Sequence, residues 1–422
     1  MSMWKRLLVA VAVVAMAIPA FSAVESVKVG GDITIYGIKR ANLEMVYDDE
    51  DSLDILQTHM RLYVQAMLTD NVEAMVRLIN ERVWGEWGGR DYDYDYDHYM
   101  QPLVDLAYIK VSDLLTPGLV LTVGRQEIQF GEGLVVGSAF LPYDGRYPTG
   151  DTWILAEDLG LQKAFDAIRV DYKFNQVPVD ITAFMAKNRE DFTSNDDDEN
   201  LYGLNLGFNA GETARVEGYY VRLQQMSDSD ENISTAGVRV TGDVAGFALK
   251  GEYAKQFGEW GGADNEGWAL LLGGQYNFPQ SELKAYVKGQ FNYYSASDSD
   301  SNGWLSFFPA NVASRIGSVT YALIGWETIG LETNLRAINV GGGIRPVEKV
   351  GLSLDWYNLT LMEDVGGDDE VGNEIDVAVT YNYTEDLTFG LQYGILLTGD
   401  LLDNAGYDDA PWQLIGSMKL AF

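Results

Sequence analysis

The chain of 422 residues holds 63 acidic against 29 basic residues, no cysteine and two histidines. The lack of cysteine excludes disulfides, thiolate nucleophiles and iron–sulfur centres, and the net charge of −34 argues against nucleic acid as a partner. After the first two dozen residues, no apolar run approaches the roughly 20 residues of a membrane-spanning helix. No Pro/Ser-rich linker divides the chain, which predicts one continuous architecture.

Residues 1–23 predict a secretory signal. Lys5 and Arg6 precede the apolar run LLVAVAVVAMAI, and small residues follow it. We expect cleavage near Ser22 or Ala23 and export of the rest, and an uncleaved membrane anchor is the alternative. An exported chain without cysteine is typical of a bacterial envelope protein.

From Val24 onward the chain alternates polar and apolar residues with a period of two, as β-strands do. The segments 59–66, 282–294 and 374–382 each have one charged and one apolar face. In a soluble sandwich the polar face would be the outside, whereas in a membrane barrel it lines the lumen. The periodicity alone leaves both interpretations open.

The connections between strands alternate in length and favour the barrel. Short polar turns such as 69–71, 210–212, 279–281 and 384–386 separate longer acidic segments such as 88–101, 295–330 and 364–372. Short turns at one rim and long loops at the other are typical of outer-membrane barrels, and the strands number about 18. The sequence therefore predicts an all-β fold, a transmembrane antiparallel β-barrel of residues 24–422 in the bacterial outer membrane, with periplasmic turns and acidic extracellular loops.

Aromatic residues support the same interpretation. The chain ends in an alternating segment closed by Phe422, which resembles the assembly signal of bacterial outer-membrane barrels. Aromatic residues near strand ends, including Tyr219 and Tyr220, predict the girdles that lie between headgroups and hydrocarbon. Ordinary packing of a β-rich fold would explain them equally well.

Five segments together resemble the alginate-export family of outer-membrane porins. They are Val123–Ile128 (VGRQEI), Gly131–Gly137 (GEGLVVG), Phe165–Arg169 (FDAIR), Phe307–Pro309 (FFP) and Gly372–Tyr381 (GNEIDVAVTY). The resemblance covers about half of the chain.

The resemblance implies an 18-stranded monomeric barrel with an arginine-bearing constriction, narrowed by a long loop that folds inward over 130–160. It leaves the solute and the direction of transport open. Two departures stand out. The family has a basic residue beside the first loop motif where this chain has Glu132, and the chain is more acidic than a polyanion exporter requires.

The face assignment predicts a nearly balanced set of charged side chains in the lumen, while the acidic excess lies in the loops. The predicted pore-lining residues are Arg61, Arg77, Arg125, Glu127, Arg169, Asp171, Arg215, Arg239, Lys284, Lys288, Glu374 and Asp376. They can form ion-pair ladders that shape the wall, an ion-selective constriction, or both. We expect Arg125 and Arg169 to face the narrowest point and to favour anions.

The sequence predicts no cofactor and no strong metal site. Asp298–Gly303 matches the first half of a calcium loop, but Pro309 stands where a bidentate glutamate is required. The acidic runs Asp91–His98 and Asn195–Glu199 could bind divalent cations loosely and bridge to lipopolysaccharide, or be solvated loops.

The predicted function is a passive channel for a hydrophilic, charged solute or an oligo- or polysaccharide, in contact with outer-membrane lipid and lipopolysaccharide. A structural or adhesin-type barrel without transport is the main alternative. An outer-membrane hydrolase using His98 would lack an accompanying serine motif.

Overall fold

The computed structural model describes most of the chain after the predicted signal. The described ranges are 24–42, 52–85, 102–138, 159–190, 198–226, 231–299, 301–308, 316–325, 333–407 and 409–422. The predicted signal at 1–23, the acidic run Asp91–His98 and all of 139–158 lie outside them. Within the described ranges, no helix is both long and apolar enough to cross a membrane.

The 20 strands of the described residues form one sheet, and its strands pair antiparallel except for one pair of short strands. The strands are β1 (Ser26–Ala41), β2 (Ser52–Thr69), β3 (Val72–Val83), β4 (Leu103–Ser112), β5 (Leu119–Gln126), β6 (Phe165–Lys173), β7 (Val179–Arg189), β8 (Asp198–Ala210), β9 (Ala214–Met226), β10 (Asn232–Val244), β11 (Phe247–Trp260), β12 (Ala263–Asn265), β13 (Trp268–Asn277), β14 (Tyr286–Tyr294), β15 (Ser301–Asn302), β16 (Leu335–Val347), β17 (Val350–Val365), β18 (Asp368–Asn382), β19 (Leu387–Thr398) and β20 (Trp412–Ala421), and the helices are α3 (Val319–Gly325) and α4 (Asp400–Asn404).

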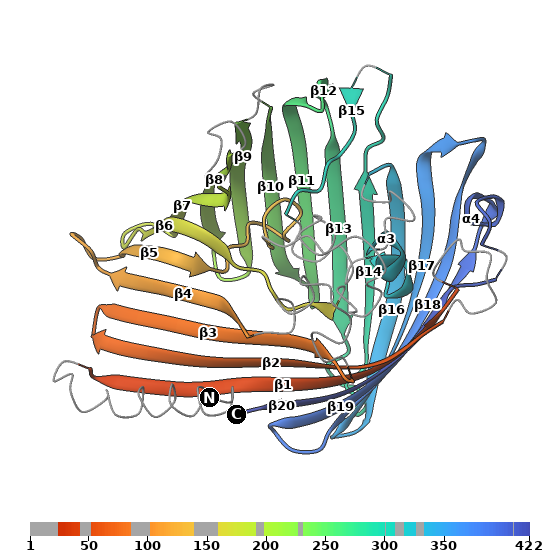
Figure 1. Cartoon of the computed structure of the whole chain (residues 1–422), viewed down its shortest axis with the longest axis horizontal. Coiled ribbons are helices and arrows are strands. Elements are labelled where there is room, and N and C mark those ends of the chain that lie inside the picture. Colours follow the sequence, from red (N-terminus) through yellow and green to blue (C-terminus); the bar gives the residue numbers. More distant parts are fainter. Residues whose placement is uncertain are drawn as a thin grey trace.

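The sheet closes on itself because β1 pairs antiparallel with both β2 and β20. The short β12 and β15 pair with each other in parallel at one rim, and the other 18 of the 20 strands form the wall. Figure 1 shows these strands winding from the red β1 to the blue β20 beside it. The predicted all-β, 18-stranded antiparallel barrel is confirmed.

The connections alternate as predicted. Turns of two to eight residues join β2 to β3, β4 to β5, β6 to β7, β8 to β9, β10 to β11, β13 to β14, β16 to β17 and β18 to β19 at one rim, the short-turn rim. The other rim, the long-loop rim, carries the segments 127–164, 295–334 and 399–411. One predicted long loop, 364–372, is wrong. There β17 and β18 extend to a two-residue turn, Gly366-Gly367, in which both glycines have the positive φ that such turns require.

The wall has an apolar outer face and a polar inner face. Val240 on β10 is 48% exposed and points outward, while its neighbour Arg239 points into the lumen. Consecutive Tyr219 and Tyr220 were both predicted in the aromatic girdle, but only Tyr220 lies on the outer face. Tyr219 is buried inside, because alternation sends neighbouring side chains to opposite faces.

Candidate functional site

The segment 127–138, which follows β5, lies inside the barrel, as the family resemblance implies. Its apolar side chains are buried, and Phe130 contacts Phe184 and Tyr219 with ring centroids 5.2 and 6.3 Å apart. Val136 forms an isolated bridge with Phe308, so two segments distant in sequence meet in the lumen. The sequence folds inward here because apolar residues at a rim without lipid can be buried only against other protein. We call 127–138 the inward loop.

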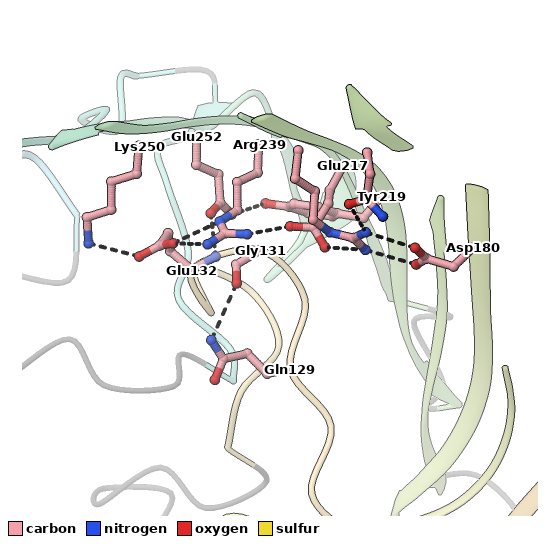
Figure 2. A network of polar contacts seen from close by, with 11 residues as sticks. Gln129, Gly131, Glu132, Asp180, Glu217, Tyr219, Arg239, Lys250 and Glu252 are labelled. Atoms are coloured by element: carbon pink, nitrogen blue, oxygen red, sulfur yellow. Dashed lines mark hydrogen bonds and ion pairs between the residues drawn. The ribbon is translucent and has the colours of Figure 1, made fainter. Parts of the chain in front are cut away.

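Glu132, near the tip of the inward loop, binds two cations of the wall (Figure 2). Its Oε1 accepts hydrogen bonds from Arg239 Nε at 2.8 Å and Nη2 at 2.5 Å, and its Oε2 accepts one from Lys250 Nζ at 2.9 Å. Burial alone would raise the pKa of this carboxyl, but the hydrogen bonds and charges of Lys250 and Arg239 hold its pKa below the ordinary value. Glu132 is therefore a charged carboxylate that binds the inward loop to β10 and β11.

A second carboxylate, Glu252 on β11, holds the backbone of the same loop. It accepts the Glu132 backbone N–H at 2.5 Å and the Tyr219 hydroxyl at 2.7 Å. Gly131 has a φ of +56°, and a Cβ there would lie 2.5 Å from a Glu252 oxygen. The approach of loop to wall therefore requires glycine at this position.

The ion pairs continue around the wall from β10 to β7. Arg239 also donates to Glu217 at 2.5 Å, and Glu217 accepts from Arg215 at 3.3 Å. Arg215 makes a bidentate pair with Asp180, with nitrogen to oxygen distances of 2.8 and 2.9 Å. Figure 2 shows the resulting chain of alternating charges, which begins at Lys250 and ends at Asp180. It fixes each guanidinium in a single direction toward the lumen.

Glu374 on β18 anchors a second inward segment, the helix α3. It accepts backbone N–H groups from Ser318, Val319 and Thr320 at 2.6, 2.7 and 2.8 Å, and the Thr320 hydroxyl at 2.5 Å. Asp376 accepts the Ser318 hydroxyl at 2.6 Å. The first N–H groups of a helix lack intrahelical partners, and a carboxylate at this end satisfies them.

A third inward segment, 303–308, is held by an amide. The Gln256 side chain accepts the Leu305 N–H at 2.9 Å and donates to the Leu305 carbonyl at 2.7 Å. Trp304 is fully buried, and Phe308 contacts Phe165. Apolar residues of all three inward segments form one cluster with the inner side chains of the wall. The lumen is therefore narrowed by packed protein.

A cavity of about 780 Å³ lies between the inward loop and the short-turn rim. Its lining combines cations with hydroxyl and amide groups, and the only described acidic groups in it are Glu132, Glu212 of a rim turn and Asp243 near the end of β10. The charged and polar residues of the lining are Glu132, Asn209, Glu212, Thr213, Arg215, Arg239, Thr241, Asp243, Lys250, Gln275, Lys288, Gln290, Asn339 and Tyr357. Such a surface suits a hydrated, charged solute.

Most of the predicted pore-lining residues lie on the inner wall, each bound to a partner. Arg61 pairs with Asp32 at 2.9 Å, Arg77 with Asp105 at 2.5 Å and with Glu127, Arg169 with Asp171 at 2.8 Å, and Lys288 with Asp355 at 2.8 Å. Arg215 and Arg239 belong to the ion-pair chain, and Glu374 and Asp376 hold α3. Their geometry is therefore that of ion pairs along the wall. Those that line the cavity also face its interior.

The structure contradicts the predicted position of Arg125 in the lumen. Its guanidinium pairs with Asp166 at 3.0 Å, and both residues follow the alternation of Val123 and Ile168, which are exposed on the outer face. Arg125 therefore does not lie beside Arg169 in the lumen. It is the penultimate residue of β5, at the long-loop rim, where the outer surface faces headgroups and polar residues occur on both faces.

The structure also contradicts the predicted position of Lys284 on a pore-lining strand. The predicted strand 282–294 begins only at Tyr286, and Lys284 lies exposed in the preceding turn, with its N–H donated to the Ser281 carbonyl at 3.0 Å. Its φ of +47° is incompatible with a strand. The turn that starts at Pro279 is longer than its three polar residues indicated, so Lys284 belongs to the short-turn rim.

The sequence interpretation missed Glu132 as a functional residue and noted it only as a departure from the family. The available signal was a single carboxylate between Gly131 and Gly133 in an otherwise apolar segment. A charge in such a segment requires a partner, which the fold supplies from Arg239 and Lys250. Gln256 gave no comparable signal, because one amide on a polar face is ordinary.

The described residues contain no group of three or more histidines, aspartates and glutamates arranged to hold a metal ion. The partial calcium motif 298–303 instead closes a turn, in which Asp298 accepts the Ser301 N–H at 2.6 Å. The acidic runs Asp91–His98 and Asn195–Asp197 lie outside the described residues, so loosely bound cations remain a prediction.

The model of the alginate export family matches residues 27–412. The chain belongs to the alginate export family. It is thus a channel-type β-barrel of the bacterial outer membrane, and the predicted class and localisation are confirmed. Among curated proteins, none matches the chain significantly.

Solved outer-membrane barrels share the fold. OccK5 (OpdH) of Pseudomonas aeruginosa superposes with a TM-score of 0.59 and 11% identity, covering 95% of this chain and 99% of that one. OccAB4 of Acinetobacter baumannii gives 0.60 and 11%, with 94% and 98% covered, and OccD3 (OpdP) of P. aeruginosa gives 0.58 and 12%, with 97% of each covered. At this identity the likeness shows the barrel architecture and not the solute.

Proposed function

We propose that this family member is a passive channel whose lumen favours small hydrophilic solutes carrying negative charge. The observation that supports it is the cavity below the inward loop, which Arg215, Arg239, Lys250 and Lys288 line together. Each of these cations is paired with a protein carboxylate, so a solute carboxylate that enters the cavity meets cations already held in place and competes with those partners for them.

The position of the cations strengthens their effect. The inward loop and α3 reduce the water-filled cross-section beside the wall, and a charge acts more strongly on a passing ion where few waters screen it. The acidic excess of the chain lies mainly outside this region, in loops and rim turns. We therefore expect the narrowed lumen, and not the vestibule, to set selectivity.

Planar-bilayer recording in a KCl gradient tests this proposal. We expect discrete unit conductance and a reversal potential on the anion-selective side. Lys288→Glu reverses a charge that faces the cavity and should shift the potential toward cations. Arg125→Glu makes the same reversal of charge on the outer face and serves as the matched control. Equal shifts in both variants, with both barrels folded, would place selectivity in the general surface charge and contradict the proposal.

A structural barrel without transport is the second candidate. The buried apolar cluster inside the lumen, with Trp304 and Phe308 at its centre, favours it, because protein that fills a lumen blocks water. Absence of unit conductance in a folded, reconstituted barrel would support this candidate.

We extend the proposal to acidic oligosaccharides and to a monomeric state. The family is named for alginate export, and an acidic oligosaccharide carries the same carboxylates as the small solutes proposed above. The wall leaves no unpaired edge among its described strands, so closure requires no second copy. Vesicle swelling in isosmotic acidic and neutral oligosaccharides of equal length tests the first point, and mass measurement in detergent tests the second.

A further inference from the structure

Two arginines on the outer face of the wall differ in their partners from the inner arginines and from Arg125, which pairs with Asp166. On the inner face, Arg61, Arg77 and Arg239 each bind a carboxylate. On the outer face, Arg222 of β9 and Arg336 of β16 have no hydrogen bond or ion pair with any described residue, and the Nε of each is covered by protein. Two outward guanidinium groups therefore have no anionic partner in the described part of the chain.

Both arginines lie close to the long-loop rim. Arg222 precedes the end of β9 by four residues and follows the alternation of the outward Tyr220. Arg336 is the second residue of β16 and follows the alternation of the outward Val340. In outer-membrane barrels the rim with long loops is the extracellular one, so these side chains lie at the outer leaflet.

Three more side chains complete an outward strip between them. Lys255 of β11 is paired in register with Trp268, and Tyr293 is paired in register with Arg336. The rings of Trp268 and Tyr293 are stacked, 4.2 Å apart and inclined by 17°. Lys255 donates one hydrogen bond to the neutral Glu266 carbonyl, so its side chain has further N–H groups for another acceptor. We call Arg222, Lys255, Trp268, Tyr293 and Arg336 the interfacial basic strip.

The composition of the strip identifies the chemistry of its ligand. Stacked tryptophan and tyrosine mark the depth of lipid headgroups, where one end of a side chain is apolar and the other wet. A guanidinium at this depth, partly covered and without a carboxylate among the described residues, can bind an anion from outside the protein. Phosphate is the anion of lipid headgroups, and guanidinium binds it with two parallel hydrogen bonds.

We propose that the interfacial basic strip binds the phosphate groups of an anionic glycolipid in the outer leaflet. Neighbouring strands lie about 4.8 Å apart, so the five strand spacings from β9 to β16 separate Arg222 from Arg336 by about 24 Å. That distance accommodates more than one phosphate, with Lys255 between the two arginines. The site is on the outside of the wall and does not depend on which solute the lumen conducts.

Binding of diphosphorylated lipid A to the full-length barrel in detergent tests the proposal. We expect the double variant Arg222→Gln/Arg336→Gln to bind at least about tenfold more weakly, because two bidentate contacts are lost. Arg345→Gln is the matched control, since Arg345 is an exposed arginine near the short-turn end of β16, the strand that carries Arg336. The control should bind as the unsubstituted barrel does.

Four outcomes overturn the proposal. They are unchanged binding in the double variant, an equal loss in Arg345→Gln, equal binding of dephosphorylated lipid A, and displacement of the lipid by millimolar inorganic phosphate. The heat-dependent shift in electrophoretic mobility shows whether each variant is folded. If the glutamine variant does not fold, Arg222→Lys/Arg336→Lys keeps the charge but loses the bidentate geometry, and binding equal to that of the unsubstituted barrel then contradicts the guanidinium–phosphate contact.

Discussion

Two regions of the lumen hold an inward segment by opposite means. On β10 and β11, the wall supplies the cations Arg239 and Lys250, and the loop supplies the carboxylate of Glu132. On β18, the wall supplies the carboxylates of Glu374 and Asp376, and the segment supplies only neutral backbone and hydroxyl donors. The same task is therefore performed once by an ion pair and once by the N-terminus of a helix.

The difference predicts different sensitivities. An ion pair beside a water-filled cavity is weakened by salt and by competing anions, because both screen or replace its charges. Neither salt nor competing anions can reach a fully buried carboxylate that accepts several N–H groups. We therefore expect the inward loop to respond to the solution and α3 to be a fixed part of the wall.

Glu374→Ala should have the largest effect. The Val319 and Thr320 N–H groups and the Thr320 hydroxyl would lose their acceptor, while the Ser318 N–H keeps Asp376. Each unsatisfied buried donor costs about 1–3 kcal/mol, so the unfolding free energy should fall by at least about 3 kcal/mol. Urea titration of the barrel in lipid vesicles measures it. Glu363→Ala, at an exposed position on β17, is the control. Similar stabilities of the two variants would mean that Glu374 does not hold α3.

Val240→Arg tests the faces on which the comparison rests. Val240 is outward at the middle of β10, and arginine facing lipid near the midplane should cost about 2–4 kcal/mol. Arg239→Gln, one residue away on the inner face, should cost less, because Lys250 still binds Glu132. The same vesicle titration applies. A larger loss from Arg239→Gln would reverse the assigned faces.

Glu132→Gln removes the charge of the inward loop and keeps its shape. Glutamine carries no charge, and its NH2 group cannot accept the hydrogen bond that one carboxylate oxygen accepts from Arg239 or Lys250. We therefore expect a loss of about 1–2 kcal/mol and larger open-channel current noise. Raising the salt concentration should increase noise in the unsubstituted channel and leave the variant unchanged. Glu212→Gln, in a rim turn that lines the same cavity, should behave like the unsubstituted channel. Identical salt responses in the unsubstituted channel and in both variants would mean that the ion pair of Glu132 does not control the motion of the inward loop.

The pH dependence should be the smallest effect. The pKa of Glu132 is lowered in the folded barrel, so its contribution to stability is complete above the ordinary value of 4.5 and is lost as the pH falls through the folded value. The difference in unfolding free energy between the unsubstituted barrel and Glu132→Gln should be constant above pH 4.5 and shrink below it. If the difference already shrank between about pH 6 and about pH 5, the pKa of Glu132 would be raised in the folded barrel, which is opposite to the expected direction.

The sequence by itself determined the barrel. Alternation along β2, β10 and β18 assigns faces directly, since a period of two leaves each side chain only two directions. Alternating loop lengths then predicted the strand number, which the structure confirms. That the long loops are extracellular stays a prediction. The same rule failed at strand ends, for Arg125 and Lys284, where lipid no longer selects an apolar outer face or the chain has already turned.

Only the tertiary structure decided which charges meet. Glu132 lies more than 100 residues from Arg239 and Lys250, and Ser318 lies 56 residues from Glu374, so no local spacing relates them. Their contacts follow from the path of the inward segments through the lumen, which depends on how apolar side chains from distant segments pack together. That Arg222 and Arg336 have no partner among the described residues is likewise visible only in the assembled wall, because it depends on strands that are distant in sequence.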